Sequence, residues 1–155
     1  MTVSITRTPA AFQRPFCDVT TASQSLANTT TTTADLPASA TVDNGAAVTG
    51  TALLDGTNDR VYLRRAGLWQ VHAVTNWAVN GTGKRTLSIV NNSGTTIAQN
   101  TNDNFSGFFA CIHSASALVY TSVTTDYVQA KLYQSSGGAL ATTTTVRAVW
   151  LGAYL

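Results

Sequence analysis

The clearest pattern in the chain is the alternation of apolar and polar positions between Leu68 and Val79. The odd positions form a mainly apolar row: Trp69, Val71, Ala73, Thr75 and Trp77. A period of two places these side chains on the same side of a β-strand. We therefore expect a strand with one buried face and one outward face.

Two further segments alternate in the same way. Asn80-Gly81 is a hairpin signal, because both residues accept the positive φ of tight turns, and the strand expected next, 85–91, places Leu87 and Ile89 inward. In 127–134 one row is apolar, comprising Val128, Ala130 and Leu132. The other row is amphipathic, comprising Tyr127, Gln129, Lys131 and Tyr133.

Other segments predict strands from weaker patterns. They are a β-prone stretch over 16–33, a strand over 46–54, a short one over 61–63, one over 95–100, an irregular one over 105–111, one over 112–120 in which neither row is clearly apolar, and a closing one over 146–155. Turn signals recur about every ten residues, which is typical of a sandwich or barrel. We expect eight to ten strands in an all-β, two-sheet antiparallel sandwich spanning 16–155.

Composition supports this fold class and excludes several others. The chain contains no Glu and only 10% charged residues, but 27 Thr, 12 Ser and 10 Asn. Thr and Val fit a pleated surface, and the scarcity of Lys, Glu and Met argues against helices. A net charge of +2 on scattered residues gives no basic patch for nucleic acid, and no apolar run is long enough to span a membrane.

Candidate chemistry is sparse. Cys17 and Cys111 are expected to be buried reduced thiols, which pair only if the fold brings their two segments together. No Gly-x-Ser-x-Gly motif is present, and the Asp residues fall mainly in turns, so we expect no enzyme, catalytic residue or cofactor. Asp55, Asn58 and Asp59 offer oxygen ligands to calcium, but local hydrogen bonding in a turn is the favoured role, and no metal site is predicted.

The first fifteen residues are expected to form an extended arm. Pro9 and Pro15 oppose regular strand pairing, and the polar residues between them bury little apolar surface. Phe12 and Phe16 are exceptions, because a tail gains nothing from exposed phenylalanines. They predict an arm that docks on its own domain or on a neighbour.

An ordered set of motifs resembles a known family. The set comprises Ala66-Gly67-Leu68-Trp69, then Asn80-Gly81-Thr82-Gly83-Lys84-Arg85, then Asp126-Tyr127-Val128, and finally a Ser135-Ser136-Gly137-Gly138 turn. It resembles the C1q/TNF-like jelly roll, in the version common in bacteriophage virion proteins. The chain departs from that pattern at Thr125, where a glycine is usual. The resemblance implies a homotrimer in which one sheet face of each subunit meets on a threefold axis.

Together these observations predict a non-enzymatic virion protein. We expect a trimeric capsid decoration or cement protein that binds the major capsid protein, or another virion protein, through its arm, with Phe12 and Phe16 as anchors. Tyr127, Gln129, Lys131 and Tyr133 are expected at the trimer interface, because tyrosine supplies both apolar area and a hydrogen-bonding tip. The alternative is a receptor-binding or tail-fibre tip domain that binds host saccharide through loops around Asp55, Asn58 and Asp59.

Overall fold

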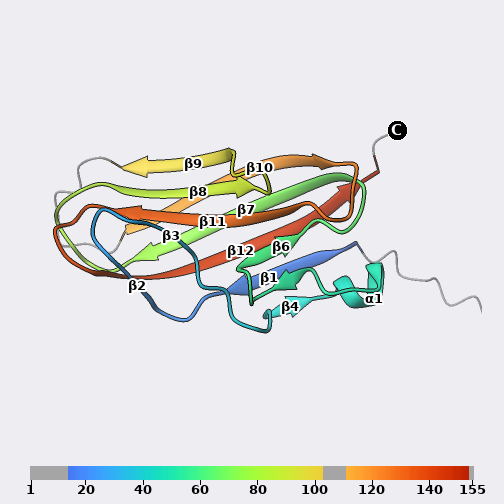
Figure 1. The fold of residues 1–155 in the computed structure, drawn as a ribbon, viewed down its shortest axis with the longest axis horizontal. Coiled ribbons are helices and arrows are strands. Elements are labelled where there is room, and N and C mark those ends of the chain that lie inside the picture. Colours follow the sequence, from blue (N-terminus) through green and yellow to red (C-terminus); the bar gives the residue numbers. More distant parts are fainter. Residues whose placement is uncertain (1–13, 103–110, 154–155) are drawn as a thin grey trace, which may run out of the picture.

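The computed structural model describes residues 14–102 and 111–153 of the chain. They form two antiparallel sheets stacked face to face, in the order of a jelly-roll sandwich (Figure 1). Twelve strands are described rather than eight to ten, because the segment over 16–33 divides into three short strands and two further strands are only two residues long. The expected all-β jelly-roll class is confirmed.

The first sheet contains the longest strands. Its order is β10 (Cys111–Thr121), β7 (Gly67–Trp77), β12 (Leu140–Gly152), β1 (Phe16–Thr20) and β4 (Val42–Asp43), and β2 (Gln24–Leu26) also pairs with β12. Strand β7 lies next to the edge strand β10 and pairs on its other side with β12.

The second sheet presents one of its faces to the viewer in Figure 1. Its order is β5 (Leu54–Asp55), β6 (Arg60–Tyr62), β11 (Tyr127–Gln134), β8 (Arg85–Asn91) and β9 (Thr96–Asn102), and β3 (Thr31–Thr33) also pairs with β11. Strand β8 therefore has a hydrogen-bonded neighbour on each side.

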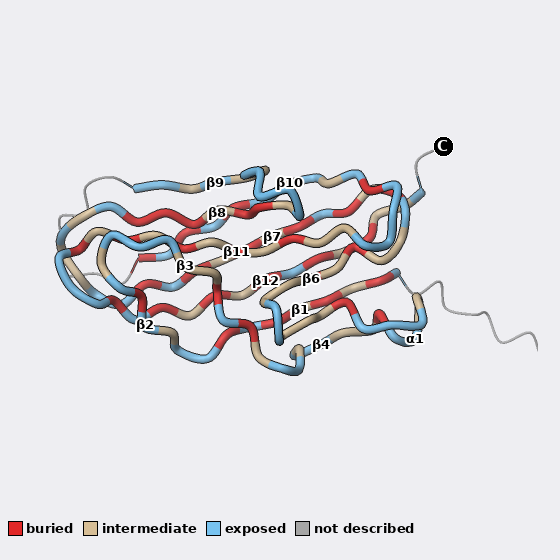
Figure 2. The backbone as a smooth tube through the Cα atoms, viewed as in Figure 1, coloured by how far each residue is buried: buried red, intermediate tan, exposed pale blue. Residues whose placement is uncertain are grey.

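The core lies between the sheets and is built from the rows that the alternation predicts. Trp69, Val71, Ala73, Thr75 and Trp77 of β7 are all buried. Leu87 and Ile89 of β8 and the apolar row of β11 meet them from the second sheet. Figure 2 shows this regular change between buried and outward residues along β7 and β11. Burial of these rows in a shared core explains why period-two strands assemble as two layers.

Several threonines are buried, and two of them form a pair between β7 and β12. Thr75 on β7 and Thr144 on β12 are both fully buried, and their hydroxyl oxygens lie 3.0 Å apart in a hydrogen bond. The closing strand begins earlier than predicted, because it includes threonines that the apolar pattern did not mark. Strand β12 begins at Leu140, not at Val146, and includes Thr142–Thr145. The inward threonines count as polar in the sequence pattern, but their β-branched side chains favour a strand.

The expected strand over 46–54 is wrong. A short helix, α1 (Gly45–Thr49), occupies its first four residues and is followed by Gly50, whose φ is +80°. The cause is Asp43: its Oδ1 accepts a hydrogen bond from the Gly45 N–H at 2.7 Å, while its Oδ2 accepts from Leu53 N–H and Leu54 N–H, each at 2.8 Å. One carboxylate thus binds both ends of the segment and closes it as a loop.

Strand β10 resolves a segment that the sequence left undecided. Its odd residues Cys111, His113 and Ala115 point into the core, and its even residues point outward. The register with β7, in which Cys111 lies opposite Trp77 and Thr121 opposite Gly67, determines this choice. Of the irregular strand expected over 105–111, only Cys111 falls within the described residues.

Candidate interaction surfaces

The outward face of the second sheet is hollowed. A cavity of about 700 Å³ lies over β8 and between its neighbours, and we call it the β8 trough. Residues that line it include Thr86, Ser88, Gln99, Gln129, Lys131 and Tyr133. Its ends are marked by Lys84 on one side and by the Asn91–Gly94 turn on the other.

Differences in side-chain length create the trough. Thr86 and Ser88 of β8 are small, and they stand directly opposite Tyr133 and Lys131 of β11. On the other side Ser88 stands opposite Gln99 of β9. Cross-strand pairs of this kind lie side by side on one face, so a low row runs between two higher rows. The floor is therefore β8, and β11 and β9 are the walls.

The predicted tyrosine row forms one wall of this trough. Tyr127, Gln129, Lys131 and Tyr133 are all half-buried. The Tyr127 ring meets the Tyr62 ring edge to face at 5.7 Å, and the Arg60 guanidinium lies 4.3 Å from its centre. These contacts orient Tyr127 within the subunit.

Polar contacts also hold the two middle residues of the row. Lys131 Nζ donates to Thr33 Oγ1 at 2.5 Å, and Gln129 Nε2 donates to the Asn58 carbonyl at 3.0 Å. The row is thus positioned by its own subunit. Its role at a trimer interface stays a prediction.

The outward face of the first sheet carries the more exposed apolar side chains. On β10, Ile112 and Leu118 are each 66% exposed and Tyr120 is 58% exposed. Tyr120 stands opposite the half-buried Leu68 of β7, and Leu118 stands opposite Gln70. Leu118, Tyr120 and Leu68 are neighbours at one end of the two strands, whereas Ser114 and Ser116 separate Ile112 from them. Large exposed apolar side chains that lie together mark interaction sites. The sequence did not predict which row of this strand faces outward, because Ser114 and Ser116 interrupt the apolar residues.

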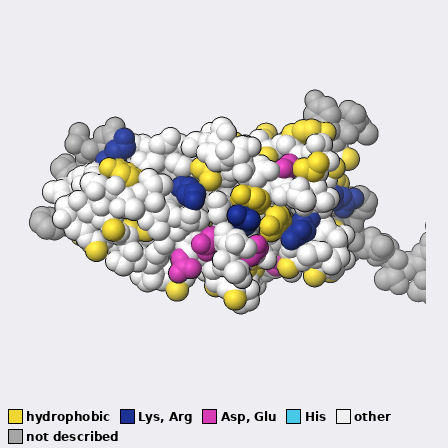
Figure 3. Space-filling model, viewed as in Figure 1, with side chains coloured by type: hydrophobic (Ala, Val, Ile, Leu, Met, Phe, Trp, Pro, Cys, Tyr) yellow, Lys and Arg dark blue, Asp and Glu magenta, His cyan; other side chains and the backbone are white. Residues whose placement is uncertain are grey.

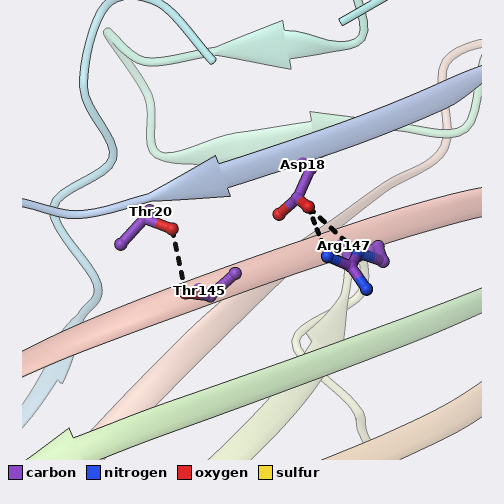
Figure 4. A network of polar contacts seen from close by, with 4 residues as sticks. All are labelled: Asp18, Thr20, Thr145 and Arg147. Atoms are coloured by element: carbon purple, nitrogen blue, oxygen red, sulfur yellow. Dashed lines mark hydrogen bonds and ion pairs between the residues drawn. The ribbon is translucent and has the colours of Figure 1, made fainter. Parts of the chain in front are cut away.

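A polar network lies on the same sheet away from β10, where β1 pairs with β12 (Figure 4). Asp18 on β1 and Arg147 on β12 form an ion pair, and the hydroxyl oxygens of Thr20 and Thr145 lie 2.9 Å apart. Both contacts join residues paired in the β1–β12 register. They connect the first strand of the domain to the last.

Phe16, a predicted arm anchor, belongs to this strand pair. It is half-buried in β1 opposite Val149, and the Arg147 guanidinium lies 5.9 Å from its ring centre. Phe16 is the first residue of β1 and so lies where the arm joins the domain. Its contact with a virion partner stays a prediction. Phe12, the other predicted anchor, lies outside the described residues.

The turn that the sequence offered as a binding loop is occupied by its own contacts. Asn58 donates from its backbone N–H and from Nδ2 to the Asp55 carboxylate, at 3.2 and 2.9 Å. The side-chain hydrogen bond from Asn58 is the main reason why the pKa of Asp55 lies below its usual value. Asp59 Oδ1 accepts from Leu36 N–H at 2.8 Å. Within residues 14–102 and 111–153, three or more His, Cys, Asp or Glu residues do not gather as metal ligands would.

The two cysteines are separate, free thiols. Cys17 lies on β1 and Cys111 on β10, with β12 and β7 between them. Three strand spacings of about 4.8 Å exceed the reach of a disulfide. Burial, reinforced by Asp43 and Asp18, raises the pKa of Cys17 to about 12. Burial also raises the pKa of Cys111, so neither thiol is activated as a nucleophile.

A buried polar group lies where β10 faces β8. His113 and Arg85 are 3% and 0% exposed. Burial, and secondarily the charge of Arg85, lowers the pKa of His113, while burial lowers that of Arg85. The Trp77 ring packs edge to face on His113.

In the described part of the chain, no helix is long and apolar enough to cross a membrane.

Known proteins resemble the chain in structure rather than in sequence. No family model matches the chain, and no curated protein matches it. Among solved structures, the globular domain of a zebrafish complement 1qA protein is similar, with a TM-score of 0.65 and 9% identity over 92% of this chain and 100% of that one. Eiger TNF from S. frugiperda has a TM-score of 0.56 and 10% identity over 92% and 96%.

A bacteriophage structure also matches. The PRD1 vertex protein P5 has a TM-score of 0.55 and 16% identity, over 89% of this chain and 97% of that one. At these identities the likeness concerns the fold. The fold is therefore a C1q/TNF-like jelly roll, as the motif set implied, and it occurs in at least one phage vertex protein.

Proposed function

We propose that this protein is a non-enzymatic structural component of a bacteriophage virion and assembles as a homotrimer. The observation that carries the proposal is the exposed apolar row on β10, with Ile112, Leu118 and Tyr120 facing outward. The shared fold with a phage vertex protein supports the virion location. The fold by itself does not define a function, so the surface carries the argument for assembly.

The trimer contact is best supported on the first sheet. Fully burying one leucine side chain contributes about 1.5–3 kcal/mol. Leu118, Tyr120 and the neighbouring Leu68 lie together at one end of β10 and β7, so each of three subunits would bury the same cluster. Tyrosine and leucine at the centre of a contact, with a polar rim around them, are typical of stable interfaces.

The tyrosine row predicted from the sequence remains the alternative contact. Interfaces approach the packing density of protein interiors. The row borders a hollow of about 700 Å³, which a neighbouring subunit would have to fill with a convex surface. This requirement favours the β10 row, whose side chains project.

Capsid attachment is assigned to the N-terminal arm, residues 1–15, with Phe12 as an anchor and Phe16 at its base. Asn44 Nδ2 donates to the Arg14 carbonyl at 2.9 Å, and Trp150 N–H donates to the Pro15 carbonyl at 3.0 Å. These bonds hold the last two arm residues on the domain. The proposed partner is the major capsid protein or another virion protein.

The oligomer is tested by light scattering. The native protein is expected at three times the 16.3 kDa of one chain, and Leu118→Lys should reduce the mass to that of a monomer. Val79→Lys, at another exposed apolar residue, is the matched control and should leave the trimer intact. Tyr133→Lys tests the alternative contact. A monomeric native protein would remove the proposal.

Attachment is tested separately. Deleting residues 1–13 keeps Arg14 and Pro15 in place, so the domain and trimer should persist while binding to purified capsids is lost. Phe12→Ala should weaken that binding without changing the mass. Full attachment of the truncated protein would count against the arm. Strong binding of the isolated protein to host cells through the loop around Asp55, Asn58 and Asp59 would instead favour the receptor-binding alternative.

A further inference from the structure

The β8 trough has the chemistry of a ligand site as well as the shape of one. Its lining combines hydroxyl groups from Thr86 and Ser88, amides from Gln99 and Gln129, and ammonium groups from Lys84 and Lys131. Hydroxyls and amides both donate and accept hydrogen bonds, whereas lysine only donates. A large pocket with a few convergent polar groups is the kind of place where small ligands bind.

The charge of the trough has one sign. Among the described residues that line it, two are lysines and none is acidic. Asp126 lies beyond one end, where its carboxylate accepts hydrogen bonds from Asn92 Nδ2 and Thr121 Oγ1. In Figure 3 the Lys and Arg side chains on this face lie apart from one another, and those near the middle of the view adjoin Asp and hydrophobic side chains. An anionic ligand is therefore favoured, because it forms charge-assisted hydrogen bonds with the lysines.

The tyrosines determine which anionic ligand fits best. Tyr127 and Tyr133 line the trough six residues apart on one row of β11, which is about 20 Å at 3.3 Å per residue. Aromatic rings provide apolar surface beside a polar tip, as a sugar ring with its hydroxyls requires. The site is long enough for several linked sugars.

An extended peptide fits less well. Peptides that bind along a strand form hydrogen bonds with an unpaired sheet edge. Strand β8, the floor, is paired on both sides with β11 and β9. Only side chains are therefore presented to the ligand, and most of those on the floor are short hydroxyls.

We propose that the β8 trough binds a short acidic oligosaccharide, with carboxylate groups at Lys84 and Lys131 and sugar rings on Tyr127 and Tyr133. This site goes beyond the structural role proposed above. It also differs from the loop around Asp55 and Asn58, whose polar groups bond to each other. Binding here requires that the face remain open in the assembled protein, as a trimer contact through β10 would allow.

The test uses the full-length protein and titration calorimetry with a tetrasaccharide of galacturonic acid. A neutral galactose tetrasaccharide and a tetraglutamate peptide serve as matched ligands. We expect only the acidic sugar to bind, with an affinity that falls as salt is added. Equal binding of the neutral sugar, tighter binding of the peptide, or no binding of the acidic sugar would each overturn the proposal.

Variants locate the site. Lys131→Met and Lys84→Met are each expected to lower the affinity about tenfold, the equivalent of one charge-assisted contact. Ser88→Leu places a larger side chain on the floor of the trough and should lower the affinity for the acidic sugar further. Thr143→Leu makes the same kind of change on an outward position of β12 and should have no effect. Thermal unfolding verifies that each variant folds, and unchanged affinity in the two lysine variants would refute the site even if Ser88→Leu failed to fold.

Discussion

Trp77 and His113 pack edge to face in the core, with ring centres 5.8 Å apart. Trp77 is on β7 and His113 is on β10, two residues beyond the residue that pairs with Trp77. Neither ring nitrogen of His113 has a hydrogen-bond partner among the described residues. Burial and the nearby Arg85 lower the pKa of His113 from its ordinary value of 6.5, so the folded protein keeps this imidazole neutral.

This pair predicts a loss of stability in mild acid. The unfolded chain binds a proton at His113 near pH 6.5 and the folded chain does so only at lower pH, so the free energy of unfolding should fall as pH drops below about 6.5. One group contributes at most about 1.4 kcal/mol per pH unit. Urea unfolding between about pH 7.5 and pH 5 measures the slope.

The matched variants separate His113 from His72. His113→Gln should flatten the slope, whereas His72→Gln, at a half-buried outward position, should retain it. Arg85 and Cys111 are the ionisable groups near His113, and neither is expected to change charge in this range. An unchanged slope in His113→Gln would contradict the prediction.

The thiols should be inert in the folded protein. Because burial and nearby carboxylates raise the pKa of Cys17 to about 12, and burial raises that of Cys111, almost no thiolate is present near pH 8. Iodoacetamide should modify neither residue in the native state and both residues in denaturant, as measured by intact mass. Rapid modification of the native protein, or an internal Cys17–Cys111 disulfide, would show that the segments lie differently.

Asp43 should be worth more to stability than other carboxylates. Its oxygens accept three backbone N–H groups, from Gly45, Leu53 and Leu54. Asp43→Ala leaves these donors without that partner and should cost about 2–4 kcal/mol. Asp35→Ala, at an exposed position, is the control and should change the free energy of unfolding by less than about 0.5 kcal/mol. Equal effects of the two variants would argue against this explanation of the α1 loop.

The buried threonine pair predicts non-additive substitutions. Thr75→Val leaves the Thr144 hydroxyl without its partner in the core and should destabilise the protein by about 1–2 kcal/mol. Thr75→Val combined with Thr144→Val removes both hydroxyls at nearly constant shape and should restore most of that stability. A double-mutant cycle by denaturant unfolding measures the coupling. If the stability losses of Thr75→Val and Thr144→Val simply added in the double variant, the two hydroxyls would not be coupled, contrary to this prediction.

Local periodicity was sufficient for the strands with one strongly apolar row. In β7 and β11 the buried residues are those that the alternation predicts, because a period of two assigns every second side chain to one face. In β8 the predicted Leu87 and Ile89 are buried, but Thr86 and Val90 of the other row are buried as well. The motif set also indicated the C1q/TNF-like fold, which the solved structures share. The closing strand was predicted only in part, since threonines that pair in the core look polar in the sequence.

The surfaces depended on tertiary structure. Asp43 closes a loop over a segment whose own pattern favoured a strand, and that contact joins residues ten and eleven positions apart. On β10 both rows are mixed, and the register with β7 selected the row that includes Leu118 and Tyr120 as outward. The trough exists only because short residues of β8 stand between longer ones of β11 and β9. The sequence alone therefore determined which residues alternate, whereas strand pairing decided which rows became the core, the exposed apolar surface and the trough.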